Sequence, residues 1–212
     1  MTTNSCATPG RSPLTDAVPD AMFASTRYSS RPRYLSLTPD AAGSQHLLVI
    51  EAGTLAEGQA DELSKAFAPV ADRLQVLVTG AAVDIPGATA YADLDATLHA
   101  LRHGLQLATM GHRVYIHGTE PYVWSVYTQL MPLGLDRHQV HMSHGGSLKR
   151  RVWCTHCHSL TEDVTTNIVP CGGCGRHLLV RDHFSRRFGA YMGVQIDAEV
   201  PGVRPAIEEV FP

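Results

Sequence analysis

Short, continuous apolar runs recur along residues 46–144, and segments with a helical spacing of apolar positions separate them. Runs of this length, bounded by glycine or polar residues, are typical of strands that are buried on both faces of a parallel sheet. The pattern predicts strands over residues 46–50, 74–78, 114–116 and 139–142.

The intervening segments predict three helices. The first covers residues 57–67, and the third begins with Pro121 in its first turn. The second covers residues 92–110, where an apolar stripe recurs at steps of four, three and four: Leu94, Leu98, Leu101 and Leu105. Alternation of strands and helices predicts an α/β domain, with a small parallel sheet, helices on its faces and right-handed crossovers.

Residues 149–200 show a different pattern, in which strand-like stretches flank two cysteine pairs. The stretches cover residues 151–153, 168–170, 177–181 and 191–196. An order of knuckle, strand, knuckle, strand is typical of a zinc ribbon. The sequence is therefore divided into a flexible segment over residues 1–33, the α/β domain over 34–148, the ribbon over 149–200 and an extended tail over 201–212.

The first 33 residues are rich in Ser, Thr, Pro and Ala, which predicts a flexible segment. Within it Cys6 is expected to be unpaired, whereas Met22, Phe23 and Tyr28 are candidates for docking on a partner. The segment lacks the apolar core of a secretory signal, and no apolar run approaches the roughly 20 residues that span a bilayer. We therefore expect a cytoplasmic protein without a membrane partner.

Charge is distributed unevenly along the chain. Residues 34–148 carry five basic and eleven acidic side chains, whereas residues 149–212 carry eight and seven. This imbalance predicts two regions with different surfaces. The overall acidic balance, 17 basic against 20 acidic residues, argues against a nucleic-acid partner. A ribbon that binds nucleic acid is the weakest of the functional alternatives.

The strongest chemical signal is two Cys-x-x-Cys pairs separated by thirteen residues: Cys154, Cys157, Cys171 and Cys174. This spacing builds a tetrahedral thiolate site for one metal ion. Two disulfides are the alternative, and the absence of a secretory signal favours the reduced metal site. Because sulfur would fill all four positions, the metal is predicted to be structural, and no catalytic or cofactor-binding residue is assigned. The ribbon has few apolar residues and would need the ion to fold.

Four thiolates suit Zn²⁺ or a single iron ion. Gly172, Gly173 and Gly175 fit the second knuckle, while His156 and His158 stand at equivalent positions in the first. Iron knuckles usually have glycine just after the second cysteine, so His158 favours zinc over iron. The spacing of plant-type [2Fe–2S] ligands does not fit.

The chain has twelve histidines, and their positions do not indicate a second metal site. His99, His103 and His112 are predicted on helix surfaces or turns, and His141 and His144 at or just past a strand end. We expect none of these five to be a metal ligand.

The segment Arg113–His141 resembles the last strand–helix–strand unit of ferredoxin-reductase nicotinamide domains, in which a strand ends in Cys-Gly-Pro before a helix. Here His117 stands in place of that cysteine and Thr119 in place of the proline. The first strand leads into residues 51–54 without a glycine-rich turn, and the chain contains no Gly-x-Gly-x-x-Gly. The prediction is a reductase-like scaffold that has lost dinucleotide binding.

The cysteine pairs and three phrases, Val164–Cys171, Arg181–Arg187 and Ala190–Gln195, resemble the small subunit of bacterial dimethylamine monooxygenases. The likeness is close over residues 110–202 and looser before them. It implies a heteromeric complex that uses NADPH and O₂ to convert dimethylamine to methylamine and formaldehyde. It also implies haem on one partner subunit, with FMN and a [2Fe–2S] cluster on reductase partners.

Because this chain contains no recognisable haem, flavin or [2Fe–2S] motif, the resemblance implies an accessory role for it. Two alternatives stay open. In one, iron in the four-cysteine site makes the chain a rubredoxin-like electron carrier. In the other, residues 46–144 bind nicotinamide and the chain is a reductase component.

Overall fold

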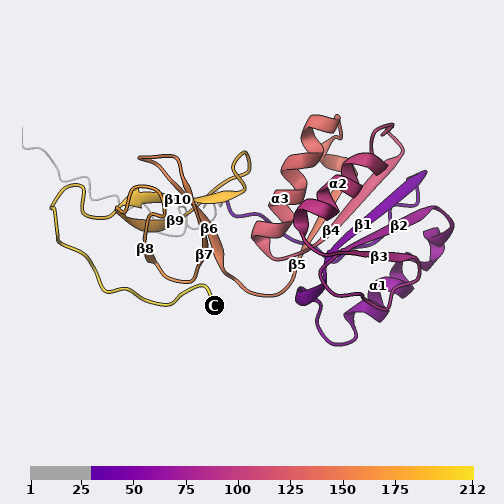
Figure 1. The fold of residues 1–212 in the computed structure, drawn as a ribbon, viewed down its shortest axis with the longest axis horizontal. Coiled ribbons are helices and arrows are strands. Elements are labelled where there is room, and N and C mark those ends of the chain that lie inside the picture. Colours follow the sequence, from indigo (N-terminus) through magenta and orange to yellow (C-terminus); the bar gives the residue numbers. More distant parts are fainter. Residues whose placement is uncertain (1–29) are drawn as a thin grey trace, which may run out of the picture.

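Two five-stranded β-sheets, one after the other along the chain, organise residues 30–212, which are the residues that this computed structural model describes (Figure 1). None of the helices in this range is long and apolar enough to cross a membrane. The expectations for Cys6, Met22, Phe23 and Tyr28 concern residues outside the described range.

The first sheet is entirely parallel, in the order β3-β2-β1-β4-β5. Its strands are β1 (Gln45–Glu51), β2 (Leu74–Thr79), β3 (Ala88–Tyr91), β4 (His112–Gly118) and β5 (Val140–His144). Its helices are α1 (Gln59–Phe67), α2 (Leu94–Gly104) and α3 (Glu120–Leu130), with short 3₁₀ turns η2 (Ala52–Thr54), η3 (Ala68–Arg73), η4 (Met131–Leu133) and η5 (Arg137–Gln139). The α/β class and the parallel sheet predicted from the sequence are confirmed.

The central strands are buried on both faces, which explains why their sequences are continuous apolar runs. On β1, Leu47 and Val49 pack in the core beneath α2 and α3, whereas Leu48 and Ile50 pack in a second core beneath α1. Figure 1 shows α2 and α3 on one face of the sheet and α1 on the other. Successive side chains of a strand point to opposite faces, so alternate residues of an apolar run fill the two cores.

Two features of this part differ from the prediction. Strand β3 was not predicted, because its four residues are half-buried or exposed and lie at the edge of the sheet. Helix α2 ends at Gly104 instead of residue 110, and Leu105 leaves the helical conformation with φ −104° and ψ 9°. Leu105 is nevertheless buried in the core, so the apolar stripe continues past the end of the helix.

The second sheet forms the ribbon, in the order β7-β6-β10-β9-β8. Its strands are β6 (Arg150–Cys154), β7 (Leu160–Val164), β8 (Ile168–Pro170), β9 (His177–Ser185) and β10 (Ala190–Gln195). Neighbours are antiparallel except β6 and β10, which are parallel. Strand β7 was not predicted because its sequence is mostly polar. Strand β9 is longer than its apolar stretch, since it continues through the polar residues 181–183.

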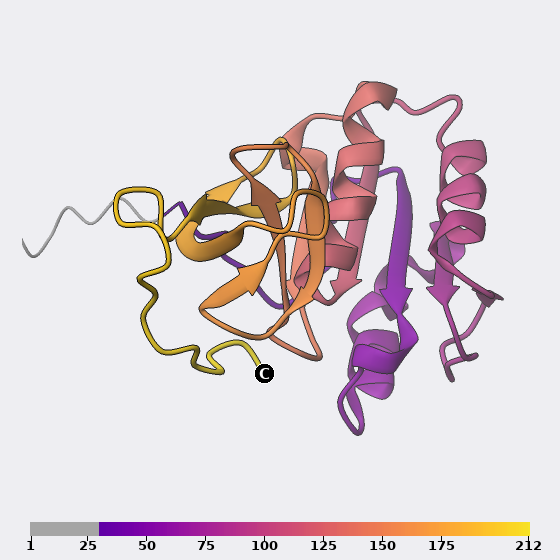
Figure 2. The same ribbon diagram turned by 60° about the vertical axis from the view of Figure 1, so that its left-hand side comes forward.

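Residues 201–212 run extended along the outside of the ribbon, as the views in Figures 1 and 2 show. An isolated bridge pairs Thr166 with Glu209, and the Val210 N–H donates to the Thr165 carbonyl at 2.9 Å. The tail then returns to the start of the ribbon, where the Leu148 N–H donates to the Pro212 carbonyl at 2.6 Å.

Helix α3 joins the two sheets. Trp124 on this helix is 1% exposed and packs against Phe184 of the ribbon with ring centroids 4.9 Å apart. Its indole N–H donates to the Tyr34 hydroxyl at 2.9 Å, and that hydroxyl donates to the Glu120 carboxylate at 2.7 Å. Tyr191 of β10 donates to the same carboxylate at 3.3 Å. The segment before β1 is thereby held between the helix and the ribbon.

Arg150 fixes the tail at this joint. Its guanidinium carbon lies 3.8 Å from the ring centroid of Tyr191 and 3.7 Å from that of Phe211. The same group donates to the Asp182 carboxylate at 2.9 Å. A buried cation between two aromatic rings keeps its charge compensated while its aliphatic stem fills the core.

Replacing this side chain tests the joint. Arg150→Ala is expected to lower the free energy of unfolding by about 2 kcal/mol, because it removes two cation–π contacts and the partly buried ion pair. Urea denaturation measures the change, and amide exchange in residues 207–212 should accelerate. The matched control is Arg181→Ala, an exposed arginine of β9 that should leave both measurements unchanged. Equal stabilities of the two variants would contradict this role for Arg150.

Candidate functional site

The four predicted cysteines lie on two knuckles with matching backbone geometry. In the first knuckle the Cys154 N–H donates to the Ser159 carbonyl at 2.9 Å, and the His158 N–H donates to the Cys154 carbonyl at 3.0 Å. In the second knuckle, Cys171 and Gly175 make the equivalent bonds at 2.8 and 2.9 Å. Each turn directs its two sulfur atoms toward the other knuckle.

The sulfur atoms converge on one point. All four Sγ atoms lie within 4.8 Å of one another, with Cys154 and Cys174 3.9 Å apart and Cys157 and Cys171 3.5 Å apart. Four thiolates at the usual zinc–sulfur distance of about 2.3 Å stand roughly 3.8 Å apart in a tetrahedron. Disulfide sulfurs would be about 2.05 Å apart. The spacing therefore fits a mononuclear tetrahedral metal and does not fit two disulfides.

His158 occupies the position that Gly175 occupies in the second knuckle. Its φ is +64°, and that of Gly175 is +72°. Left-handed backbone costs a residue with a Cβ roughly 1–2 kcal/mol, so the surrounding structure must hold His158 in place. The imidazole stacks on Trp153 with ring centroids 5.1 Å apart and planes 13° apart. This stacking accounts for a histidine at a position that suits glycine.

The thiols differ in acidity. Burial raises the pKa of Cys154 to about 11. Hydrogen bonds from the Ser159 side chain and backbone lower the pKa of Cys157 to about 5. Hydrogen bonds from Arg176, first from its backbone and then from its side chain, lower the pKa of Cys174. The knuckles thus stabilise thiolates at their more exposed cysteines, and a bound cation would stabilise the thiolate of buried Cys154.

Among residues 30–212, these four cysteines are the only group of three or more His, Cys, Asp or Glu whose ligand atoms converge in this way. His99, His103, His112, His141 and His144 lie in the α/β part, outside that group. His141 stacks on Tyr115 with ring centroids 5.0 Å apart.

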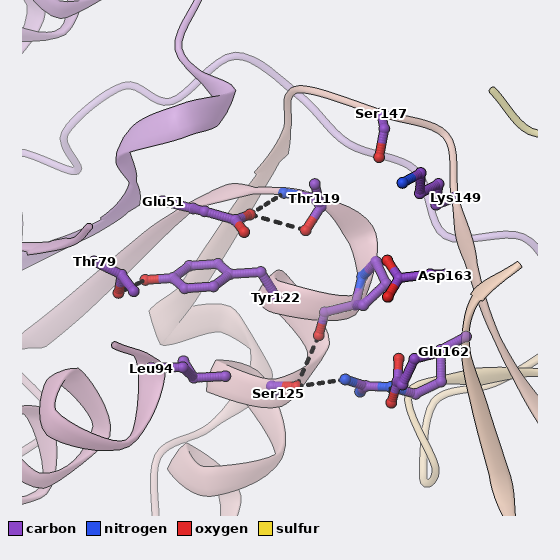
Figure 3. A pocket seen from close by; sticks show the side chains of 12 residues that line it. Glu51, Thr79, Leu94, Thr119, Tyr122, Ser125, Ser147, Lys149, Glu162 and Asp163 are labelled. Carbon is purple, nitrogen blue, oxygen red and sulfur yellow. Dashed lines mark hydrogen bonds and ion pairs between the residues drawn. The ribbon is translucent and has the colours of Figure 1, made fainter. Parts of the chain in front are cut away.

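A second feature, a cleft of about 500 Å³, lies where the carboxyl ends of β1, β2 and β4 face the ribbon (Figure 3). Nucleotides bind open α/β sheets at this edge. Here, however, the Glu51 carboxylate accepts hydrogen bonds from the Thr119 N–H and hydroxyl, both at 2.8 Å. The N-terminus of α3, which would attract a phosphate, is therefore already occupied by an anion of the same chain.

The ribbon supplies the opposite wall of the cleft. Arg151 donates to Glu162 at 2.6 Å and to the Ser125 hydroxyl of α3 at 2.9 Å. Lys149 and Asp163 stand at the rim, as Figure 3 shows, and Asp163 has a φ of +55°. The cleft could not be found from the sequence, since its lining residues come from separate segments spread between Glu51 and Asp163. The one local signal was Glu51 at the end of an apolar strand.

Two family models match the chain. The N-terminal domain of the family described as dimethylamine monooxygenase subunit DmmA-like matches residues 26–140, and the C-terminal domain of the same family matches residues 151–194. The second match contains both knuckles. Together the two models cover most of the chain.

A curated relative is similar in sequence to this chain over nearly the whole length of the relative. The heme-dependent oxidative N-demethylase delta subunit of Ectopseudomonas mendocina (strain ymp) is 35% identical over 178 residues, which are 83% of this chain and 94% of the relative. Among solved structures, a ferredoxin reductase of carbazole 1,9a-dioxygenase is similar at 18% identity with a TM-score of 0.40. That match covers 50% of this chain and 34% of the reductase.

Removing the metal tests whether the ribbon needs a bound ion to stay folded. A strong chelator is expected to release one ion per chain and to unfold the ribbon, because the core there contains Cys154 and Cys171 themselves. Metal analysis and Trp153 fluorescence measure the two effects. Cys171→Ser should behave like the chelated protein. Cys6→Ser, which changes the one cysteine outside the two pairs, should keep its ion. A ribbon that stays folded without metal would contradict the expectation.

The hydrogen bonds of Glu51 to Thr119 predict that the cleft does not bind nucleotides. Titration of NADPH into the purified chain should give no saturable change in NADPH fluorescence, because the α3 N-terminus already binds a carboxylate. Glu51→Gln, which keeps the shape and removes the charge, is the matched variant and should show whether any weak binding is limited by that charge. Saturable binding to the wild-type chain would contradict the assignment.

Proposed function

The chain belongs to the DmmA-like family of dimethylamine monooxygenase subunits, and from this membership we propose that it is an accessory subunit of a multi-component, haem-dependent oxidative N-demethylase. The observation that carries the proposal is the 35% identity over 94% of a delta subunit of such an enzyme. Both family models support the same assignment.

The proposed reaction is the oxidative demethylation of dimethylamine by O₂ and NADPH, which yields methylamine and formaldehyde. Haem would sit on one partner subunit, with FMN and a [2Fe–2S] cluster on reductase partners, and the complex would work in the cytoplasm. This chain would not carry out the oxygen chemistry. Its α/β part, residues 34–148, would serve as a scaffold, since Glu51 fills the position where a phosphate would bind.

We further propose that Cys154, Cys157, Cys171 and Cys174 hold a structural Zn²⁺. The sulfur spacing supports a single tetrahedral ion, and four sulfur ligands leave no coordination position for substrate or water. The residue just after the second cysteine of the first knuckle is His158, where iron knuckles usually have glycine, and this supports zinc over iron. In this account the ion holds the ribbon, residues 149–200, in the shape that the complex requires.

An electron-carrying iron site is the alternative that one observation favours. Cys157 and Cys174 are only half-buried, so an iron ion at this site would lie near the surface, where electrons could reach it. The nicotinamide-binding alternative has less support because of the Glu51 contacts.

Two measurements on one preparation test the proposal. When the chain is expressed together with the haem and reductase subunits, we expect it to co-purify with them and to contain one zinc ion per chain. Zinc thiolates are colourless, whereas a ferric four-cysteine site absorbs in the visible range. One iron per chain with that absorbance would overturn the structural assignment, and failure to co-purify would overturn the assignment to this complex.

A further inference from the structure

A partly exposed group of aromatic and apolar side chains lies beside the first knuckle. It consists of Trp153, His158, Leu160 and Phe188, which line a hollow of about 330 Å³, and we refer to these four residues as the aromatic ledge. Trp153 stacks on His158 and also on Phe188, whose ring centroid lies 4.8 Å away with planes 9° apart. Three parallel rings therefore stand side by side at the surface of the ribbon.

The ledge is built from one face of the ribbon sheet. On β6 the inward residues Val152 and Cys154 are buried, whereas Trp153 between them points to the opposite face. Leu160 of β7 pairs directly with Trp153, so the two side chains share that face. Phe188 reaches it from the β9–β10 hairpin, whose Gly189 lies so close to Trp124 that an added Cβ would come within 2.8 Å of the Trp124 Cβ.

The metal knuckle orders the ledge. His158 belongs to the turn that carries Cys154 and Cys157, and its N–H bonds the Cys154 carbonyl at 3.0 Å. A left-handed histidine in that turn is strained, and its ring is the one that extends the stack beyond Trp153. The four-cysteine site and the ledge therefore share His158.

Exposure and charge indicate that the ledge meets another protein. Leu160 is 44% exposed and Phe188 39% exposed, whereas the other large apolar residues of strands β6 to β10 are buried or half-buried. The exposed Arg186 and Arg187 precede Phe188, and the Arg187 guanidinium lies 5.6 Å from its ring centroid. Aromatic side chains with arginine at the edge are the composition of interface hot spots.

We propose that the aromatic ledge is the surface through which this chain docks on another subunit of its complex, at a site where an apolar side chain is flanked by carboxylates. The apolar side chain would fill the hollow between Leu160 and Phe188, and the carboxylates would face Arg186 and Arg187. This inference rests on the proposed function, since it takes the partner from the same complex.

The charges favour such a partner over a second copy of this chain. A two-fold contact through the ledge would place Arg186 and Arg187 near the same arginines of the second copy, and like charges disfavour that packing.

The test uses the complex assembled from co-expressed subunits. Phe188→Ser combined with Leu160→Ser should weaken the affinity of the chain for the remaining subunits by about 30-fold, the effect of losing one hot spot. The matched control, Leu107→Ser, removes an apolar side chain that is 88% exposed in the α/β part and should leave the affinity unchanged. Metal content and circular dichroism should be the same in all three chains.

Charge reversal gives an independent readout. Arg186→Glu with Arg187→Glu should weaken the same association and reverse its dependence on salt, because attraction to the carboxylates is replaced by like-charge repulsion that salt screens. Arg137→Glu, at an exposed arginine of the α/β part, is the control that should change neither. Truncation of residues 1–29 should leave the affinity unchanged, and a gain in affinity would mean that the N-terminal segment covers the ledge instead.

The outcomes separate this inference from the proposed function. If the wild-type chain does not associate with the other subunits, the proposed function fails. If the wild-type chain associates and the folded Phe188→Ser, Leu160→Ser chain associates equally well, only the ledge assignment fails. Self-association of the isolated chain that these substitutions abolish would also overturn it, in favour of a second copy.

Discussion

The convergence of four sulfur atoms from two knuckles is the constraint on which the C-terminal ribbon depends. The sulfurs lie within 4.8 Å of one another, and two of the cysteines are part of the ribbon core. Small sheets with few apolar residues rarely fold without such a clasp. The same turns hold His158 and Trp153 at the surface, so the geometry of the knuckle extends directly into the face that the ribbon presents.

In the α/β part, the helix N-terminus at which α/β proteins commonly bind a phosphate is filled by the Glu51 carboxylate, and the parallel sheet is retained. The parallel sheet creates a helix N-terminus at the carboxyl end of β4, and Glu51 of β1 satisfies it from within the chain. An internal carboxylate there stabilises α3 through its free N–H groups and its dipole. Helix α3 in turn carries Trp124, which joins the sheet to the ribbon. The edge that serves as a ligand site in other α/β proteins contributes here to the joint between the two halves.

The sequence could predict those features that neighbouring residues encode, and it could not predict contacts between residues far apart in the chain. The knuckles were predictable because cysteine spacing alone determines which atoms can meet, and the equivalence of His158 and Gly175 followed from it. Buried strands such as β1 were predictable because both their faces are apolar. Strands β3 and β7 were not, since edge strands with polar side chains resemble loops. The contact of Tyr34 with Glu120 and Trp124 depends on residues about 90 positions apart, and no local pattern encodes it.

We propose that the metal of the four-cysteine site shapes the fold and transfers no electrons. This can be tested by NADPH-driven turnover of dimethylamine in the proposed complex, with this chain loaded only with Cd²⁺, a redox-inert ion that also accepts four thiolates. If the ion is structural, this complex should assemble and turn over as the native one does. Assembly with loss of turnover would contradict it, because the native ion would then be needed for electron transfer.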